Sequence, residues 1–379
     1  MPASPLFRIT APKDMWREIG EFLGPAAWPL GATNSLTRSL SLHKRCQDLS
    51  FSSCDAEQWA RWCVLEVCSA RITVHPCGYR RAIDTDVLRR AMLVLERAPN
   101  LQDLDLIFID HSYLGDNGAW ALASLRKSPR LTTVKITARF QNIGRQGASD
   151  LASLSSSPTL VSVAIELYGN KVRTEGASLL GALTQSPSIR YLSLGLGVNR
   201  VGDRAASALG APKEGNPLVK LELDLDGNNL SNKGLSRLCE HWPQSDLRVL
   251  SLSLRDNLIT DQGTAHLGAL RWSTALLDLC IDLSFNIVSD ASARELARLS
   301  ESDSIQALYI YFDNNSLSLV GVQALASMLY PGKLKKLFLS LHNNDVSPVE
   351  AYPLRDLQDS RITTLDTDIS QEYLCRLAE

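Results

Sequence analysis

Residues 247–275, LRVLSLSLRDNLITDQGTAHLGALRWSTA, contain the pattern that decides the fold. Leu250, Leu252 and Leu254 alternate with outward-facing positions, as in a strand that buries one of its two faces. Asn257 follows the strand at a turn, and the apolar spacing after the turn predicts a helix. This stretch therefore predicts one strand, one polar turn and one helix.

The same pattern, L-x-x-L-x-L-x-L-x-x-N, recurs along the chain with a period of 29 residues. Its asparagine falls at Asn170, Asn199, Asn228, Asn257, Asn286, Asn315 and Asn344. A fixed period of this length indicates a solenoid, in which each unit buries its apolar face against its neighbours. We expect the stacked asparagines to satisfy backbone groups at the turns. His111 and Gln141 occupy the asparagine position in two earlier units, which predicts a less regular start.

The repeat predicts an α/β fold with strands on one wall and helices on the other. Because a helix is wider than a strand, stacking such units bends the array into a horseshoe. The expected fold is a solenoid with a parallel β-sheet on the concave face and helices on the convex face. Ser128-Pro129, Ser157-Pro158 and Ser186-Pro187 are expected to end helices, since proline disfavours helix at the preceding residue.

Residues 183–209, LTQSPSIRYLSLGLGVNRVGDRAASAL, resemble a leucine-rich repeat of the ribonuclease-inhibitor-like class. The resemblance implies the horseshoe fold, but the class includes inhibitors, GTPase activators, immune receptors and ubiquitin-ligase receptors. Regular units are expected over residues 101–361 and irregular capping repeats over 46–100. Residues 1–45 are expected to form a small helical segment, and 362–379 a C-terminal cap.

The N-terminal segment also resembles an F-box, the helical module that binds a Skp-type adaptor of cullin ubiquitin ligases. The residues that match the opening pattern of that family are Pro12, Asp14, Ile19, Phe22 and Leu23. The resemblance implies that Pro12, Trp16, Ile19, Phe22 and Leu23 contact the adaptor. The same apolar spacing is typical of a helix that covers the first strand of a solenoid. Adaptor binding and a purely structural cap therefore remain as two interpretations.

The outward positions of the predicted strands are the candidate partner-binding site. They carry acidic and aromatic side chains at Glu166, Tyr168, Tyr191, Glu222, Asp224, Asp226, Arg255, Asp282, Tyr309, Tyr311, Asp313 and Phe338, with Arg255 as a basic interruption. Exposed aromatic residues are enriched where proteins bind partners. The pattern predicts a groove for a basic protein segment. The alternative is a solvated face, because a charge cluster is commonly no more than that.

Composition narrows the function classes further. The chain has 379 residues and a net charge of −2, which provides no basic field for nucleic acid or anionic lipid. No secretory signal or membrane-spanning apolar run is found, so we expect a cytoplasmic protein, with the nucleus as an alternative. Cys46, Cys54, Cys63, Cys68 and Cys77 lack the C-x-x-C spacing of structural zinc sites and are expected to pack as small apolar residues. No metal or cofactor is expected.

The sequence contains no phosphate-binding loop, H-E-x-x-H motif or G-x-S-x-G motif, and it offers no catalytic residues. We therefore expect a non-catalytic interaction protein that presents a concave surface to a protein partner. Its most specific form is a substrate receptor of a cullin-type ubiquitin ligase. The alternatives are a structural subunit of a large cytoskeletal or organellar assembly and a GTPase-activating protein of the Ran-activator type.

Overall fold

The computed structural model describes residues 46–52, 68–75, 83–210, 215–329, 333–346 and 365–366, with only the backbone given for the first and last of these ranges. The chain divides into two compact units, Met1–Thr37 and Arg38–Glu379, and every described residue belongs to the second. The F-box-like residues Pro12, Trp16, Ile19, Phe22 and Leu23 lie outside the described residues, and so do most residues of the predicted C-terminal cap.

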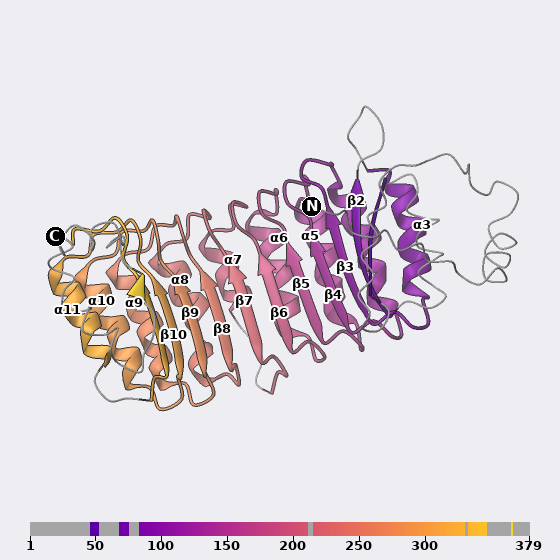
Figure 1. The fold of residues 1–379 in the computed structure, drawn as a ribbon. Helices are drawn as coiled ribbons and strands as arrows, with labels where there is room; N and C mark the ends of the chain where they lie inside the picture. The colour runs from indigo at the N-terminus through magenta and orange to yellow at the C-terminus, as the bar shows by residue number, and fades with distance from the viewer. Residues whose placement is uncertain are drawn as a thin grey trace, which may run out of the picture. The chain divides into compact units, whose positions relative to one another are not determined.

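In the described part of the second unit, twelve strands form one sheet in chain order, and every neighbouring pair is parallel. The strands are β1 Cys46–Ser52, β2 Ser69–His75, β3 Asp103–Phe108, β4 Thr133–Thr137, β5 Ser162–Glu166, β6 Tyr191–Gly195, β7 Lys220–Asp224, β8 Val249–Ser253, β9 Asp278–Asp282, β10 Ala307–Tyr311, β11 Lys336–Ser340 and β12 Leu365–Asp366. This arrangement confirms the predicted fold class, a leucine-rich-repeat solenoid (Figure 1).

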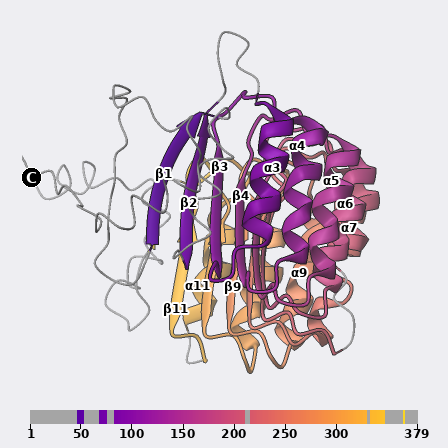
Figure 2. The same cartoon turned by 90° about the vertical axis from the view of Figure 1, so that its right-hand side faces the viewer.

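The described helices all cover one face of the sheet, and none of them lies on the other face (Figure 2). They are α3 Thr85–Glu96, α4 Gly115–Leu122, α5 Arg145–Ala152, α6 Arg173–Leu180, α7 Gly202–Leu209, α8 Asn232–Cys239, α9 Asp261–Gly268, α10 Asp290–Ala297 and α11 Leu319–Ala326. Short 3-10 turns follow most of them: η2 Ala123–Lys127, η3 Ser153–Ser156, η4 Gly181–Gln185, η5 Trp242–Gln244, η6 Ala269–Trp272, η7 Arg298–Glu301 and η8 Ser327–Leu329. Ser128, Ser157 and Ser186 end three of these turns in an extended conformation, as their following prolines predict.

The core lies between the sheet and the helices. In β8, Leu250 and Leu252 are 1% exposed, and Leu254 after the strand is fully buried, which confirms the predicted inward face. Each buried leucine contributes about 1.5–3 kcal/mol relative to an exposed one. Because every unit repeats these positions, one continuous apolar core runs along the array.

The asparagines form the predicted ladder beside this core. Asn228 shows the arrangement: its Oδ1 accepts from the backbone N–H groups of Asn199 and Val201, at 3.0 and 3.1 Å. Its Nδ2 donates to the carbonyl oxygens of Leu196 and Asp226. The side chain therefore bonds both its own turn and the preceding one, as predicted.

The earliest units differ from the sequence prediction at one residue. Gln141 does occupy the ladder position, and its Oε1 accepts from the Ser112 hydroxyl and from the backbone N–H of Leu114. The preceding ladder position is taken by the fully buried Ser112, so the assignment of His111 was wrong. The physical reason is one extra residue between β3 and this position, which leaves His111 exposed at φ 60°.

A second set of hydrogen bonds joins the starts of neighbouring helices. Asp203 accepts from the backbone N–H and the hydroxyl of Ser231, at 2.8 and 2.6 Å. Asp290 accepts from the same two groups of Ser318, at 2.7 and 2.6 Å. A carboxylate there also complements the positive end of the helix dipole. These bonds hold adjacent units in register on the helix side.

Candidate functional site

The open face of the sheet, here called the strand face, carries all twelve predicted partner-binding residues. They are Glu166 of β5, Tyr191 of β6, Glu222 and Asp224 of β7, Asp282 of β9, Tyr309 and Tyr311 of β10 and Phe338 of β11, with Tyr168, Asp226, Arg255 and Asp313 each two residues beyond a strand. All twelve are partly or fully exposed, because each alternates with a buried residue. The strand parity read from the sequence is therefore correct at every one of them.

The middle of the strand face carries carboxylates that form no salt bridge with a described residue. Two acidic residues are paired: Glu166 lies 3.5 Å from the Arg139 guanidinium and Glu222 lies 2.7 Å from the Lys220 ammonium. Across the described residues, no salt bridge reaches Asp224, Asp226, Asp282 or Asp313. We call these four the aspartate row.

Hydrogen bonds hold the aspartate row in place. Asp226 Oδ1 accepts from the Ser253 hydroxyl at 2.5 Å and from the Arg255 backbone N–H at 3.0 Å. Asp313 Oδ1 accepts equivalent bonds from Ser340 and His342, at 2.6 and 2.8 Å. Each of these two carboxylates is thus fixed by the next strand with its second oxygen left for another donor.

The pKa values in the row show the cost of partly burying carboxylates, with a smaller contribution from neighbouring charges. Burial, together with the charges of Asp226 and Glu166, raises the pKa of Asp224 to about 6. Burial also raises the pKa of Asp226, and the charge of Asp282 adds to that rise. A cation bound beside the row would reverse these shifts, since an opposite charge favours the ionised carboxylate.

Two glycines in β6 and just beyond it let side chains from β5 lean toward the row. A Cβ at Gly195 would lie 2.5 Å from the Glu166 carboxylate, and a Cβ at Gly197 would lie 2.6 Å from the Tyr168 ring. The Gly197 position also lies 3.2 Å from Asp224 Oδ1. The sequence analysis missed both residues, although glycine at successive outward strand positions indicates a close approach by other groups.

Aromatic side chains form two groups on and beside the strand face. Phe338 lies 5.1 Å from Tyr311 and 6.4 Å from Tyr309, measured between ring centroids. Tyr168 belongs to a separate group, because Phe140 lies 5.5 Å from it in an edge contact and His111 stacks on Phe140 at 5.0 Å. Phe140 was missed by the sequence analysis because it lies in a turn.

The surroundings of Tyr191 and Arg255 could not be read from the sequence. Tyr191 is 46% exposed and belongs to neither aromatic group. The Arg255 guanidinium lies 4.3 Å from the ring centroid of Phe285, in a cation–π contact. The guanidinium thus contacts a ring, and the hydrogen bond from Arg255 to the adjacent Asp226 comes from its backbone N–H.

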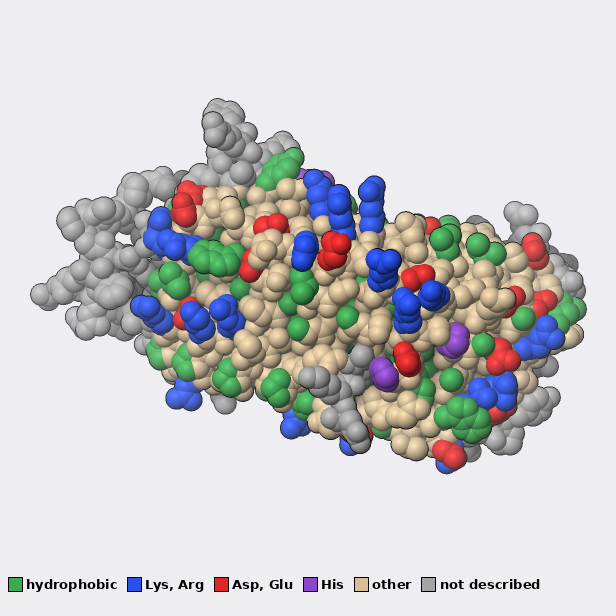
Figure 3. Space-filling view, turned by 180° about the vertical axis from the view of Figure 1, so that it is seen from behind, with side chains coloured by type: hydrophobic (Ala, Val, Ile, Leu, Met, Phe, Trp, Pro, Cys, Tyr) green, Lys and Arg blue, Asp and Glu red, His purple; other side chains and the backbone are tan. Residues whose placement is uncertain are grey.

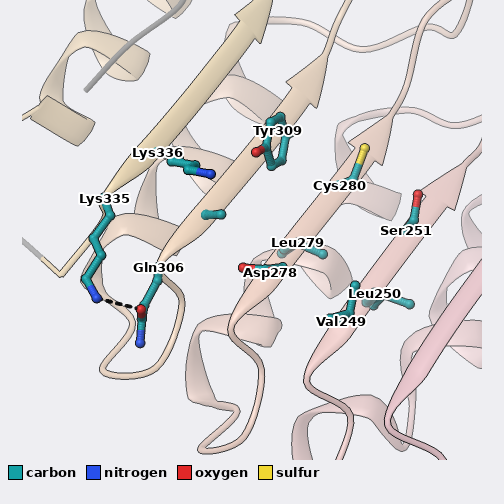
Figure 4. A pocket seen from close by; sticks show the side chains of 11 residues that line it. Val249, Leu250, Ser251, Asp278, Leu279, Cys280, Gln306, Tyr309, Lys335 and Lys336 are labelled. Atoms are coloured by element: carbon teal, nitrogen blue, oxygen red, sulfur yellow. Dashed lines mark hydrogen bonds between the residues drawn. The ribbon is translucent and has the colours of Figure 1, made fainter. Parts of the chain in front are cut away.

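Two hollows lie on the strand face among the described residues. The first, of about 420 Å³, extends from β8 to β11, and Figure 4 shows Tyr309, Cys280 and Ser251 in a row on three neighbouring strands there. The second, of about 270 Å³, extends from β4 to β8 and is lined by Glu166, Glu222 and Asp224 around Gly195. We call them the apolar hollow and the acidic hollow.

The described residues contain no group of three or more His, Cys, Asp or Glu side chains placed to hold a metal ion. Of the cysteines considered for zinc, Cys68 alone has a described side chain, and it is free. Burial raises the pKa of the Cys280 and Cys239 thiols, so both are protonated at neutral pH. Within the same ranges, no helix has the length and apolar character needed to cross a membrane.

No protein-family model and no curated protein sequence matches the chain. Among solved structures, an internalin from Listeria monocytogenes is 18% identical with a TM-score of 0.43, covering 79% of this chain and 72% of the internalin. The yeast Rad7 and Elc1 complex gives 17% identity and a TM-score of 0.49, covering 86% of this chain and 75% of the matched one. The class of protein, a leucine-rich-repeat solenoid, rests on the chain's own repeat, sheet and asparagine ladder.

Proposed function

We propose that this chain is a non-catalytic interaction protein that holds a basic segment of a protein partner on its strand face. The observation that carries the proposal is the aspartate row, whose carboxylates form no salt bridge with any described residue. The raised pKa of Asp224 supports it, because burial and, to a smaller extent, the charges of Asp226 and Glu166 disfavour its ionised form, and a bound cation would offset both.

A peptide segment fits this face better than a small ion. The carboxylates are spread over several strands and are interleaved with exposed rings, so a ligand must be long enough to contact both. Tyrosine and phenylalanine supply apolar area and cation–π contacts to lysine or arginine side chains. The helix side offers a contrast, since Figure 3 shows Lys and Arg side chains lying among Asp and Glu side chains there.

The proposal is tested by removing rings from the strand face. We expect the double substitution Tyr309→Ala with Tyr311→Ala to abolish recovery of the partner from host extracts while leaving the melting temperature nearly unchanged. Trp120 and Trp272 lie away from the strand face and are 53% and 67% exposed. Their double alanine variant is the matched control and should recover the partner normally. Equal recovery by both variants would contradict the proposal.

We also propose the more specific role of substrate receptor, with the F-box-like segment as the contact for a Skp-type adaptor. This proposal rests on the residue pattern of Pro12, Ile19, Phe22 and Leu23, and on the ribonuclease-inhibitor-like character of the repeats. Co-expression with an adaptor from the host tests it. The two proteins should co-elute, and Ile19→Asp with Phe22→Asp should separate them. Absence of co-elution, or binding that survives both substitutions, rules the adaptor role out.

A further inference from the structure

The two hollows of the strand face differ in chemistry and are adjacent along the array. In the acidic hollow, Glu166, Glu222 and Asp224 surround a floor of small residues that includes Ala164, Ser193 and Gly195. Glu166 and Glu222 are paired with Arg139 and Lys220, and Asp224 has no salt bridge with a described residue. A lysine or arginine head in this recess can therefore meet Asp224 and also approach the two glutamates. Lys135 also lines it, from the β4 side.

In the apolar hollow, the floor is made by Val249, Ser251, Cys280 and Ala307, and the Tyr309 ring forms a wall. Asp278 and Lys336 also line it, and both are exposed. The Cys280 thiol stays neutral, since its pKa is raised by burial. A large apolar side chain would cover this floor and pack on the ring, so burial of its area would favour binding.

The spacing between the hollows sets the spacing of the residues that fill them. The acidic hollow is centred on β6, and the apolar hollow is centred on β9 and β10, with Ser251 lining both. Neighbouring strands lie ~4.8 Å apart, so about three and a half strand spacings place the two centres about 17 Å apart. Four residues of an extended chain cover at most about 14 Å, and residues four apart project to the same side. The remaining ~3 Å lies within the reach of a lysine or arginine side chain.

We propose that the strand face recognises an extended segment in which a lysine or arginine and a large apolar residue are four positions apart. The basic side chain enters the acidic hollow and the apolar side chain enters the apolar hollow. This inference deepens the proposed function and rests on it. It adds a requirement that charge alone does not impose, namely an apolar residue at a fixed distance from the basic one.

Selection of random twelve-residue peptides from a display library on the full-length protein tests the inference. Enriched peptides should carry Lys or Arg and one of Leu, Ile, Phe or Met at a spacing of four. Basic peptides without a fixed apolar position would overturn the inference and leave the proposed function standing. A selection that enriches no basic peptide would contradict both.

Substitutions in both molecules then assign each hollow. Replacing the basic residue of a selected peptide by Ala should weaken its binding to the wild-type protein about tenfold. The same replacement should change binding to the Glu166→Gln, Asp224→Asn variant very little. Ala307→Phe should fill the apolar hollow and remove the effect of replacing the apolar residue. If Ala307→Phe does not fold, Tyr309→Ala removes the wall instead. If the peptide and protein substitutions change the binding free energy additively, the assignment of each side chain to its hollow is refuted.

Discussion

At the scale of single residues, Asn228 shows how much of this fold depends on one side-chain type. It is fully buried, and its amide bonds two successive turns of the solenoid. The asparagine amide supplies two N–H donors and one oxygen acceptor, and an apolar side chain of similar size supplies none of these. The asparagine at this position is therefore explained by hydrogen bonding and requires no functional role.

Asn228→Ala should lower the free energy of unfolding by about 1–3 kcal/mol, the usual cost of leaving buried polar groups without partners. Urea unfolding followed by circular dichroism measures it. The control is Glu240→Ala, at an exposed position just beyond α8, which should change stability by less than about 0.5 kcal/mol. Equal effects of the two substitutions would show that the ladder does not stabilise the fold.

Asp224 has the opposite character, because its ionisation opposes folding. Its pKa rises from 3.8 to about 6 in the folded chain, so the folded state binds more protons than the unfolded state between these values. The protonated side chain therefore favours folding below pH 3.8, and this contribution is lost as the pH rises through 6. Above that pH, the ionised carboxylate destabilises the protein.

Asp224→Asn should accordingly stabilise the protein at pH 7.5, by on the order of 1 kcal/mol after solvent screening. The amide oxygen can still accept from the Asp226 backbone N–H, as Asp224 Oδ1 does at 3.0 Å. The difference from wild type should shrink as the pH falls to 4. Thermal unfolding across this pH range measures it, and a difference independent of pH would show that Asp224 is not the titrating group.

At the scale of elements, strand β6 shapes the site because it has no large side chain on the strand face at its C-terminal end. After Tyr191, its side on the strand face carries only Ser193 and Gly195, with Gly197 just beyond, so the Glu166 side chain of β5 can lean toward β7. The Glu166 carboxylate then lies close enough for its charge to raise the pKa of Asp224. A bulkier strand at this place would keep the carboxylates of β5 and β7 apart.

Gly195→Ala should displace the Glu166 side chain, because the new Cβ would lie 2.5 Å from its carboxylate. The clash involves the end of a flexible side chain, so the unfolding free energy should change by less than about 1 kcal/mol. The pKa of Asp224 should fall as Glu166 moves away, which carboxyl carbon-13 NMR titration measures. Ser193→Ala, on the same strand, should leave this pKa unchanged. An unshifted pKa in Gly195→Ala would contradict the proposed role of the glycine.

The elements also explain which features the sequence could predict. The alternation of Leu250, Leu252 and Leu254 depends on one strand alone, so it predicts the buried face correctly. The contact of Arg255 with Phe285 joins residues from adjacent units, and the sequence pattern gives no sign of it. The hollows likewise combine residues from four or more strands. The sequence therefore predicts which side chains lie on the strand face, but it does not predict which residues each of them contacts.

At the scale of the described array, the strand face combines carboxylates and rings along several units of one parallel sheet. Association of a basic segment with this face should depend on ionic strength, since salt screens exposed charges over ~8–10 Å near physiological concentrations. Raising the salt from 50 to 500 mM should weaken binding of a selected basic peptide at least about tenfold. Fluorescence anisotropy measures this change, and binding that is insensitive to salt would exclude an electrostatic role for the row.

The most direct test of the strand face as a binding site is quantitative mass spectrometry of proteins purified with the native chain. Wild type is compared with a strand-face variant, Asp224→Asn with Asp226→Asn and Asp282→Asn, and with a helix-side variant, Glu175→Gln with Glu240→Gln and Glu295→Gln. The account predicts that one partner is lost only from the strand-face variant and that a synthetic peptide of its basic segment competes for binding. Recovery of the same proteins by the wild type and the strand-face variant would contradict it.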